Sequence, residues 1–269
     1  MLELLIEFLP FGALLGRIKW DCNISIRRKL YICILKDFAQ HLFYEVAIIY
    51  PSLYLLIFGL LLDINSFLVY SLVYFALWIL LHTIYDIFYV MNDYIFIKYE
   101  ESPTIRKYLP KNSVKKTIVL RLVYAIMLLF ILINNFKMKF MLLFATIILV
   151  LMNILHNFAN EHLRIFTFGS LRLAKWLFIP LIIKCDSVPY ILLLLLPCFH
   201  DNIIKYYQHK FARKYMFVSK FDVPLWERFI IYLPLQFLVV YPNIYVLFPN
   251  IIIVIFSIIF TKIKDKGVL

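Results

Sequence analysis

Three carboxylates recur at a spacing of seven residues within the stretch 85–111, namely Asp86, Asp93 and Glu100. On an α-helix with 3.6 residues per turn, positions seven apart drift only slightly around the axis, so the three side chains share one face. The stretch begins in an apolar run and ends in a charged one, which predicts that these carboxylates lie at the mouth of a membrane helix. Carboxylates in that position are costly to bury and usually mark ion or substrate sites.

A second polar cluster, HDNIIKYYQHKFARK, follows a later apolar run and opens at His200 and Asp201. Charge therefore gathers twice at the end of an apolar run. For Asn92, Asp93 and Glu100 the alternative interpretation is a solvated helix end, but the recurrence of a similar cluster at Asp201 favours a functional role.

The composition fits one polytopic membrane protein. Of the 269 residues, 64% are hydrophobic and only 16% are charged, and the mean hydropathy is +0.88. No soluble globular class has that balance. The net charge of +12 could indicate nucleic-acid binding, but the basic residues are confined to stretches between apolar runs, where membrane topology explains them better. The four cysteines lack CxxC spacing, which favours buried packing residues over zinc or disulfide sites.

Several apolar runs approach the roughly 20 residues needed to cross a bilayer core, so we predict an all-α, polytopic transmembrane bundle of about eight spans. In chain order the predicted spans are 42–62, 67–91, 118–133, 140–155, 166–183, a sixth from 189, 229–241 and 245–261. The stretches DINS and HNFANEHLR are predicted as a turn and a polar loop. A strongly basic loop is predicted after the second span, carrying Lys98, Arg106, Lys107, Lys111, Lys115 and Lys116.

The distribution of basic residues predicts the orientation of the bundle. With the amino terminus in the cytoplasm, most of the 28 Lys and Arg residues fall on the cytoplasmic side, and the outer turns carry only Lys137, Lys139 and Lys184. The positive-inside rule therefore predicts a cell-membrane protein with both polar clusters facing the cytoplasm. Three cations fall inside predicted spans, where a polar cavity or a snorkelling side chain must accommodate them: Arg121, Arg172 and Lys175.

We expect one integral membrane domain over residues 1–269. It divides into an interfacial or cytoplasmic segment 1–41, the helical bundle 42–261 and a short basic tail 262–269. Glu3 and Glu7 stand where a signal peptide would carry basic residues, so we expect the amino-terminal segment to be retained at the interface or to re-enter the membrane.

The two polar clusters resemble the two motifs of the UbiA family of intramembrane prenyltransferases. Asn92 and Asp93 match the opening of the family's first motif, NDxxDxxxD, and Glu100 stands at its last acidic position. Asp201 matches the first aspartate of the second motif, DxxxD. The family usually has nine spans and carries both motifs on the cytoplasmic side.

The resemblance implies transfer of a prenyl group from a polyprenyl diphosphate in the membrane to an acceptor at the cytoplasmic face. It implies Mg²⁺ held by Asp93, Glu100 and Asp201, with Asp93 and Asp201 as the catalytic residues. It also implies that both clusters converge across one central cavity. The diphosphate-binding residues that it implies are Asn92, Arg106, Lys205 and Lys210.

Each motif departs from the family at one position, because Phe96 replaces the middle aspartate of the first and Lys205 replaces the second aspartate of the second. The losses favour one magnesium ion, or a site in which Lys205 acts on the diphosphate directly as a fixed cation. They also leave an alternative open, in which the protein has lost catalysis and serves as a lipid-binding or accessory membrane subunit. A small transporter is disfavoured by five glycines and no visible internal symmetry.

Several candidate residues have plainer interpretations. Asp86 fits a structural carboxylate buried between helices as well as it fits a ligand. The loop cations are by default topology determinants and contacts to anionic lipids. The histidines lack metal-site spacing such as HExxH, and His200 beside Asp201 is the one that merits a test.

Overall fold

The computed structural model describes residues 7–9, 12, 64–99, 107–135, 139–183 and 255. In these residues the chain forms four long helices, α5 (Ile64–Tyr94), α6 (Lys111–Asn135), α7 (Lys139–Phe158) and α8 (Glu161–Ile183). A short 3₁₀ helix, η3 (Phe96–Tyr99), follows α5. The described residues include no strand, and all four long helices are long and apolar enough to cross a membrane.

The second to fifth predicted spans are confirmed as α5 to α8. The all-helical, membrane-embedded class is thereby supported for this part of the chain. The first, sixth, seventh and eighth predicted spans lie outside the described residues, so the total of about eight spans and the cytoplasmic position of the amino terminus stay predictions.

The helix ends differ from the predicted loops. Residues of the DINS turn already belong to α5, which begins at Ile64. The predicted basic loop is shorter, because Lys111, Lys115 and Lys116 lie in the first turns of α6 and Lys98 lies on η3. Lysine is a good helix former, and its long side chain carries the charge toward the membrane surface while its backbone stays helical.

The predicted polar loop HNFANEHLR is also mostly helical, and only Ala159 and Asn160 separate α7 from α8. Asn160 caps α8, since its Oδ1 accepts a hydrogen bond from the Leu163 N–H at 2.9 Å. Arg164 closes α7, since its guanidinium donates to the carbonyls of Ala159 and Asn157, each at 3.0 Å. These bonds satisfy terminal backbone groups that would otherwise be orphaned in an apolar surrounding.

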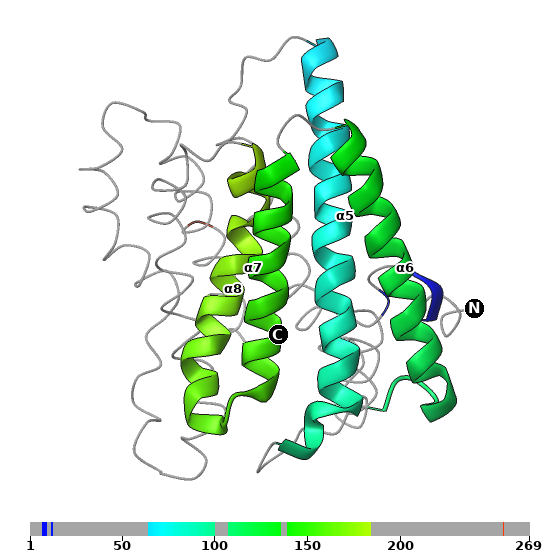
Figure 1. The fold of residues 1–269 in the computed structure, drawn as a ribbon, viewed down its shortest axis with the longest axis vertical. Coiled ribbons are helices and arrows are strands. Elements are labelled where there is room, and N and C mark those ends of the chain that lie inside the picture. Colours follow the sequence, from blue (N-terminus) through cyan, green and yellow to red (C-terminus); the bar gives the residue numbers. More distant parts are fainter. Residues whose placement is uncertain are drawn as a thin grey trace, which may run out of the picture.

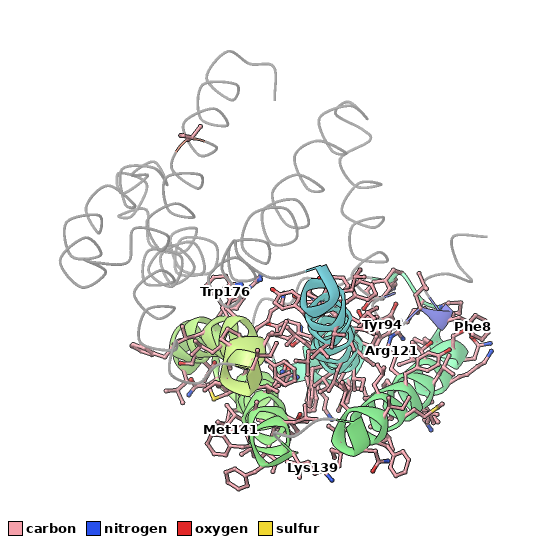
Figure 2. All side chains as sticks on the ribbon, turned by 90° about the horizontal axis from the view of Figure 1, so that it is seen from above. Phe8, Tyr94, Arg121, Lys139, Met141 and Trp176 are labelled. Carbon is pink, nitrogen blue, oxygen red and sulfur yellow. The ribbon has the colours of Figure 1, made fainter. Side chains whose placement is uncertain are left out.

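The four helices form two antiparallel hairpins, α5–α6 and α7–α8, joined mainly through α5 (Figure 1). Seen from above, α5 lies between α6 on one side and α7 and α8 on the other, while α6 and α7 diverge (Figure 2). The core consists of large apolar side chains from all four helices, including Leu77, Leu132, Leu149 and Phe178. The η3 segment and the α7–α8 corner lie at the same end of the bundle (Figure 1), which we call the motif end.

The outward faces of α6 and α7 are apolar. Large side chains such as Met127, Phe130, Phe140 and Ile147 are more than half exposed. A soluble monomer rarely exposes so much contiguous apolar surface, whereas lipid-facing helices require it. Near the amino terminus, a Glu7 carboxylate oxygen lies 2.8 Å from the ammonium nitrogen of Lys116 in the second turn of α6.

Candidate functional site

Asn92 and Asp93 lie in the last turn of α5, at the motif end. Asp93 is only 5% exposed. The Oδ1 of Asn92 is buried and accepts no hydrogen bond from the part of the chain that the structure describes. A carboxylate and an amide oxygen, both buried at one helix end, are oxygen groups of the kind that bind a hard cation or a polar ligand.

Phe96 lies on η3, and its side chain turns away from such a site. The residue is buried, and its ring packs edge-on against Phe158 at the end of α7, with ring centroids 4.7 Å apart. The position at which the resemblance implies a carboxylate is therefore occupied by an aromatic contact between η3 and α7.

Tyr94 of α5 holds the segment 107–110, which leads into α6, by hydrogen bonds. The Tyr94 hydroxyl accepts a hydrogen bond from the Leu109 N–H at 2.6 Å and donates to the Leu109 carbonyl at 3.1 Å. The Tyr94 ring also meets Tyr108 edge-on, and Val90, Leu109 and Val114 form a small apolar cluster beside it. The end of α5 is thereby anchored against the start of α6.

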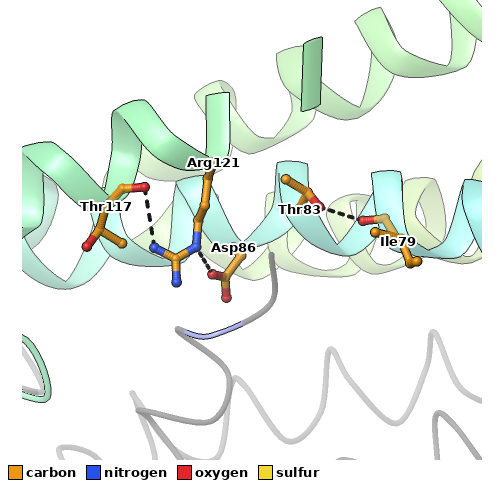
Figure 3. Close-up of polar contacts among 5 residues, drawn as sticks. All are labelled: Ile79, Thr83, Asp86, Thr117 and Arg121. Atoms are coloured by element: carbon orange, nitrogen blue, oxygen red, sulfur yellow. Dashed lines mark hydrogen bonds and ion pairs between the residues drawn. The ribbon is translucent and has the colours of Figure 1, made fainter. Parts of the chain in front are cut away.

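Asp86 forms a buried ion pair with Arg121 of α6, and neither side chain is exposed by more than 2% (Figure 3). The Arg121 guanidinium also reaches the Thr117 carbonyl at 3.5 Å. The structural interpretation of Asp86 as a carboxylate buried between helices is confirmed. Arg121 does not snorkel to the membrane surface, because its charge is neutralised within the bundle.

Lys175 lies within the apolar part of α8 and is 3% exposed. Its ammonium nitrogen lies 4.8 Å from the centroid of the Tyr85 ring on α5. A cation over an aromatic face is stabilised by the ring quadrupole, and more strongly where water is excluded. Arg172, one turn earlier on α8, stands over the Phe168 ring with its guanidinium carbon 5.4 Å from the centroid. The sequence left open whether these cations lie inside the bundle or snorkel to the membrane surface, and Lys175 lies inside the bundle.

An apolar groove of about 620 Å³ lies between α5, α6 and α7. Helix α5 forms its floor with the buried residues Leu80, Ile84 and Ile87. Phe96 and Phe158 line its motif end. The remaining lining residues are Phe88, Met91, Ile118, Leu122, Ala125, Ile126, Leu129, Thr146, Val150 and Ile154.

The groove and the carboxylates lie on opposite faces of α5. Asp86 follows Ile84 by two positions, and Asp93 follows Met91 by two, and two positions on a helix are about 200° apart. The carboxylate face is thus directed away from the groove. The aromatic residues near the motif are divided in the same way, because Phe88 and Phe96 line the groove whereas Tyr85 faces Lys175.

The remaining predicted site residues lie outside the described residues: Glu100, Arg106, Asp201, Lys205 and Lys210. Of the proposed magnesium ligands only Asp93 is described, and the described residues contain no group of three or more His, Cys, Asp or Glu side chains that could hold a metal. The convergence of the two clusters stays a prediction.

Sequence reasoning placed Arg164 in a polar loop and missed its role in closing α7. The signal that could have found the corner is Asn160, a favoured N-cap residue placed just before an apolar helical pattern. The pairing of Asp86 with Arg121 was also missed, although both were recognised as ionisable residues within spans.

No protein-family model matches the chain, and no curated protein or solved structure matches it.

Proposed function

We propose that the chain is an intramembrane prenyltransferase of the UbiA type, which moves a prenyl group from a polyprenyl diphosphate to an acceptor at the cytoplasmic face of the cell membrane. The observation that carries the proposal is the buried Asp93 carboxylate at the end of a membrane-spanning helix, preceded in the chain by Asn92, whose Oδ1 is also buried. Ionisable groups kept at such depth mark substrate or ion sites more often than structural ones.

In this proposal Asp93, Glu100 and Asp201 hold one Mg²⁺, and carboxylate oxygens are ligands that Mg²⁺ prefers. The bound ion would neutralise the charge that develops on the departing diphosphate. Asn92, Arg106, Lys205 and Lys210 bind the diphosphate oxygens, the cations as fixed charges. Asp93 and Asp201 orient the donor for transfer.

A second function is favoured by the contact between Phe96 and Phe158. A ring that is packed into an apolar groove cannot serve as a metal ligand, so the first motif has one oxygen donor fewer than the family pattern. This observation supports a non-catalytic lipid-binding or accessory membrane subunit built on the same helical bundle.

Release of diphosphate by the full chain in nanodiscs distinguishes the two. The donors are prenyl diphosphates of increasing chain length, assayed with and without Mg²⁺. The enzyme is expected to release diphosphate from at least one donor, and Asp93→Ala or Asp201→Ala is expected to abolish release. Glu7→Gln, which changes a carboxylate that is paired with Lys116 and belongs to neither motif, serves as the matched control and should remain active.

Absence of release from every donor, with the bundle shown to be helical by circular dichroism, would leave the lipid-binding function in its place. Activity that is lost completely with a chelator but is indifferent to Lys205→Ala would remove the direct role of Lys205 in holding the diphosphate.

A further inference from the structure

The groove between α5, α6 and α7 has an almost entirely apolar lining. Among the described lining residues Thr146 contributes the one hydroxyl, and that hydroxyl already donates to the Leu142 carbonyl of its own helix at 2.7 Å. No lining side chain therefore offers an unsatisfied polar group to a ligand. A ligand segment with polar atoms would leave them unpaired, so the groove selects a purely apolar one.

The groove opens sideways toward the bilayer. Its floor on α5 is buried, whereas its rim residues Leu122 and Ile126 on α6 and Ile154 on α7 are substantially exposed. The surfaces on either side of it are the lipid-facing sides of α6 and α7, so a membrane lipid reaches the groove without crossing water.

The length of the groove matches one leaflet of a bilayer. On α5 the lining runs from Leu80 to Met91, and on α6 from Ile118 to Leu129, so each stretch spans about 16 Å at 1.5 Å per residue. A bilayer hydrocarbon core is about 30 Å thick, and one leaflet is about half of that. The groove ends at Phe96 and Phe158, at the motif end of the bundle.

We propose that this groove binds one acyl chain of a membrane phospholipid from the leaflet at the motif end. The prenyl donor is the less suitable occupant, because its diphosphate would lie at Asp93, about 200° around α5 from the groove. The groove is thus a lipid site separate from the proposed active site. The bound chain packs between α6 and α7, which contact each other far less than the two helices within each hairpin do, and so joins the two hairpins there.

Native mass spectrometry of the full chain, extracted from nanodiscs of defined phosphatidylcholine and phosphatidylglycerol composition, tests the site. The wild-type chain is expected to retain one phospholipid. Ala125→Phe fills the groove from α6, and the mass increment of that lipid is expected to disappear. Ile147→Phe places the same ring on the exposed surface of α7 outside the groove and should retain the lipid.

Thr146→Leu, which fills the groove from α7 with a smaller side chain, keeps the test informative if Ala125→Phe does not fold. Asp93→Ala should retain the lipid, so that failure of the enzymatic proposal and failure of the lipid site are read separately. Equal lipid retention by wild type, Ala125→Phe and Thr146→Leu would overturn the site. Retention of an added prenyl diphosphate in place of the phospholipid, abolished by Ala125→Phe, would overturn the assigned occupant.

Discussion

One face of α5 carries Leu80, Ile84 and Met91 and lines an apolar groove, whereas the opposite face carries the buried carboxylates Asp86 and Asp93. The groove on the apolar side has exposed rim residues on α6 and α7, and lipid can cover them at little cost. The carboxylate face has no such option, because an unpaired charge inside the bilayer costs several kcal/mol. Each charge on that face therefore needs a specific partner or a ligand.

This difference determines which helix contacts are specific. The ion pair between Asp86 and Arg121 fixes the register of α5 against α6, since sliding either helix by one turn would leave two buried charges unpaired. The cation–π contact between Lys175 and Tyr85 relates α5 to α8 in the same way. On the groove side the described residues form no comparable charged contact, and there α6 and α7 diverge.

The largest effect is expected from removing one partner of the ion pair. Arg121→Ala leaves the Asp86 carboxylate buried without its cation, and breaking a buried pair in this way typically costs about 3–5 kcal/mol. Unfolding of the chain by SDS in mixed micelles, followed by circular dichroism, should show a loss of that size.

The matched control replaces both charges with apolar side chains. Asp86→Leu combined with Arg121→Met should recover most of the lost stability, because an apolar pair of similar volume carries no desolvation cost. A double variant as unstable as Arg121→Ala would show that packing, rather than charge, makes the carboxylate face specific.

The sequence was sufficient to predict the four described helices, but not which residues pair between them. Apolar runs of bilayer length are a local signal, and the second to fifth predicted spans are the four helices of the bundle. The helix ends were placed too far inward, because Lys111, Lys115 and Lys116 suggested a loop although lysine extends a helix readily. The position of a helix end depends on where the membrane–water interface lies, and hydrophobicity alone does not specify that interface.

The candidate site was predictable only in part, for a related reason. The position of Asn92 and Asp93 at the end of a span follows from the apolar run that precedes them. The pairing of Asp86 with Arg121 joins residues on different helices, and no spacing in the chain encodes it. The opposite directions of Asp93 and Phe96 depend on the end of α5 and the start of η3, which the motif resemblance did not reveal.

Phe96→Asp tests whether the groove face and the carboxylate face of α5 are separate, by introducing the carboxylate that the resemblance to the UbiA family implies at this position. The change removes a buried ring that contacts Phe158 and puts a carboxyl group into an apolar surrounding. We expect a loss of about 3 kcal/mol, since removal of a buried phenyl ring costs at least that much. We expect no gain in Mg²⁺ affinity, measured by isothermal titration calorimetry in nanodiscs.

Phe96→Leu is the control for that experiment, because it keeps an apolar side chain in the groove and should cost about 1 kcal/mol. Increased Mg²⁺ affinity or diphosphate release in Phe96→Asp would mean that η3 can turn toward Asp93, and the two faces of α5 would then be less separate than the structure indicates.

The smallest effect is expected at the contact between Lys175 and Tyr85, because a cation–π pair stabilises through a ring quadrupole rather than a full charge. A double-mutant cycle of Lys175→Met and Tyr85→Leu, measured by SDS unfolding, should give a coupling energy of about 1–2 kcal/mol. Tyr85→Phe retains the ring and should keep most of that coupling. A coupling near zero would show that Lys175 is held by other contacts, and that the carboxylate face of α5 is specific toward α6 but not toward α8.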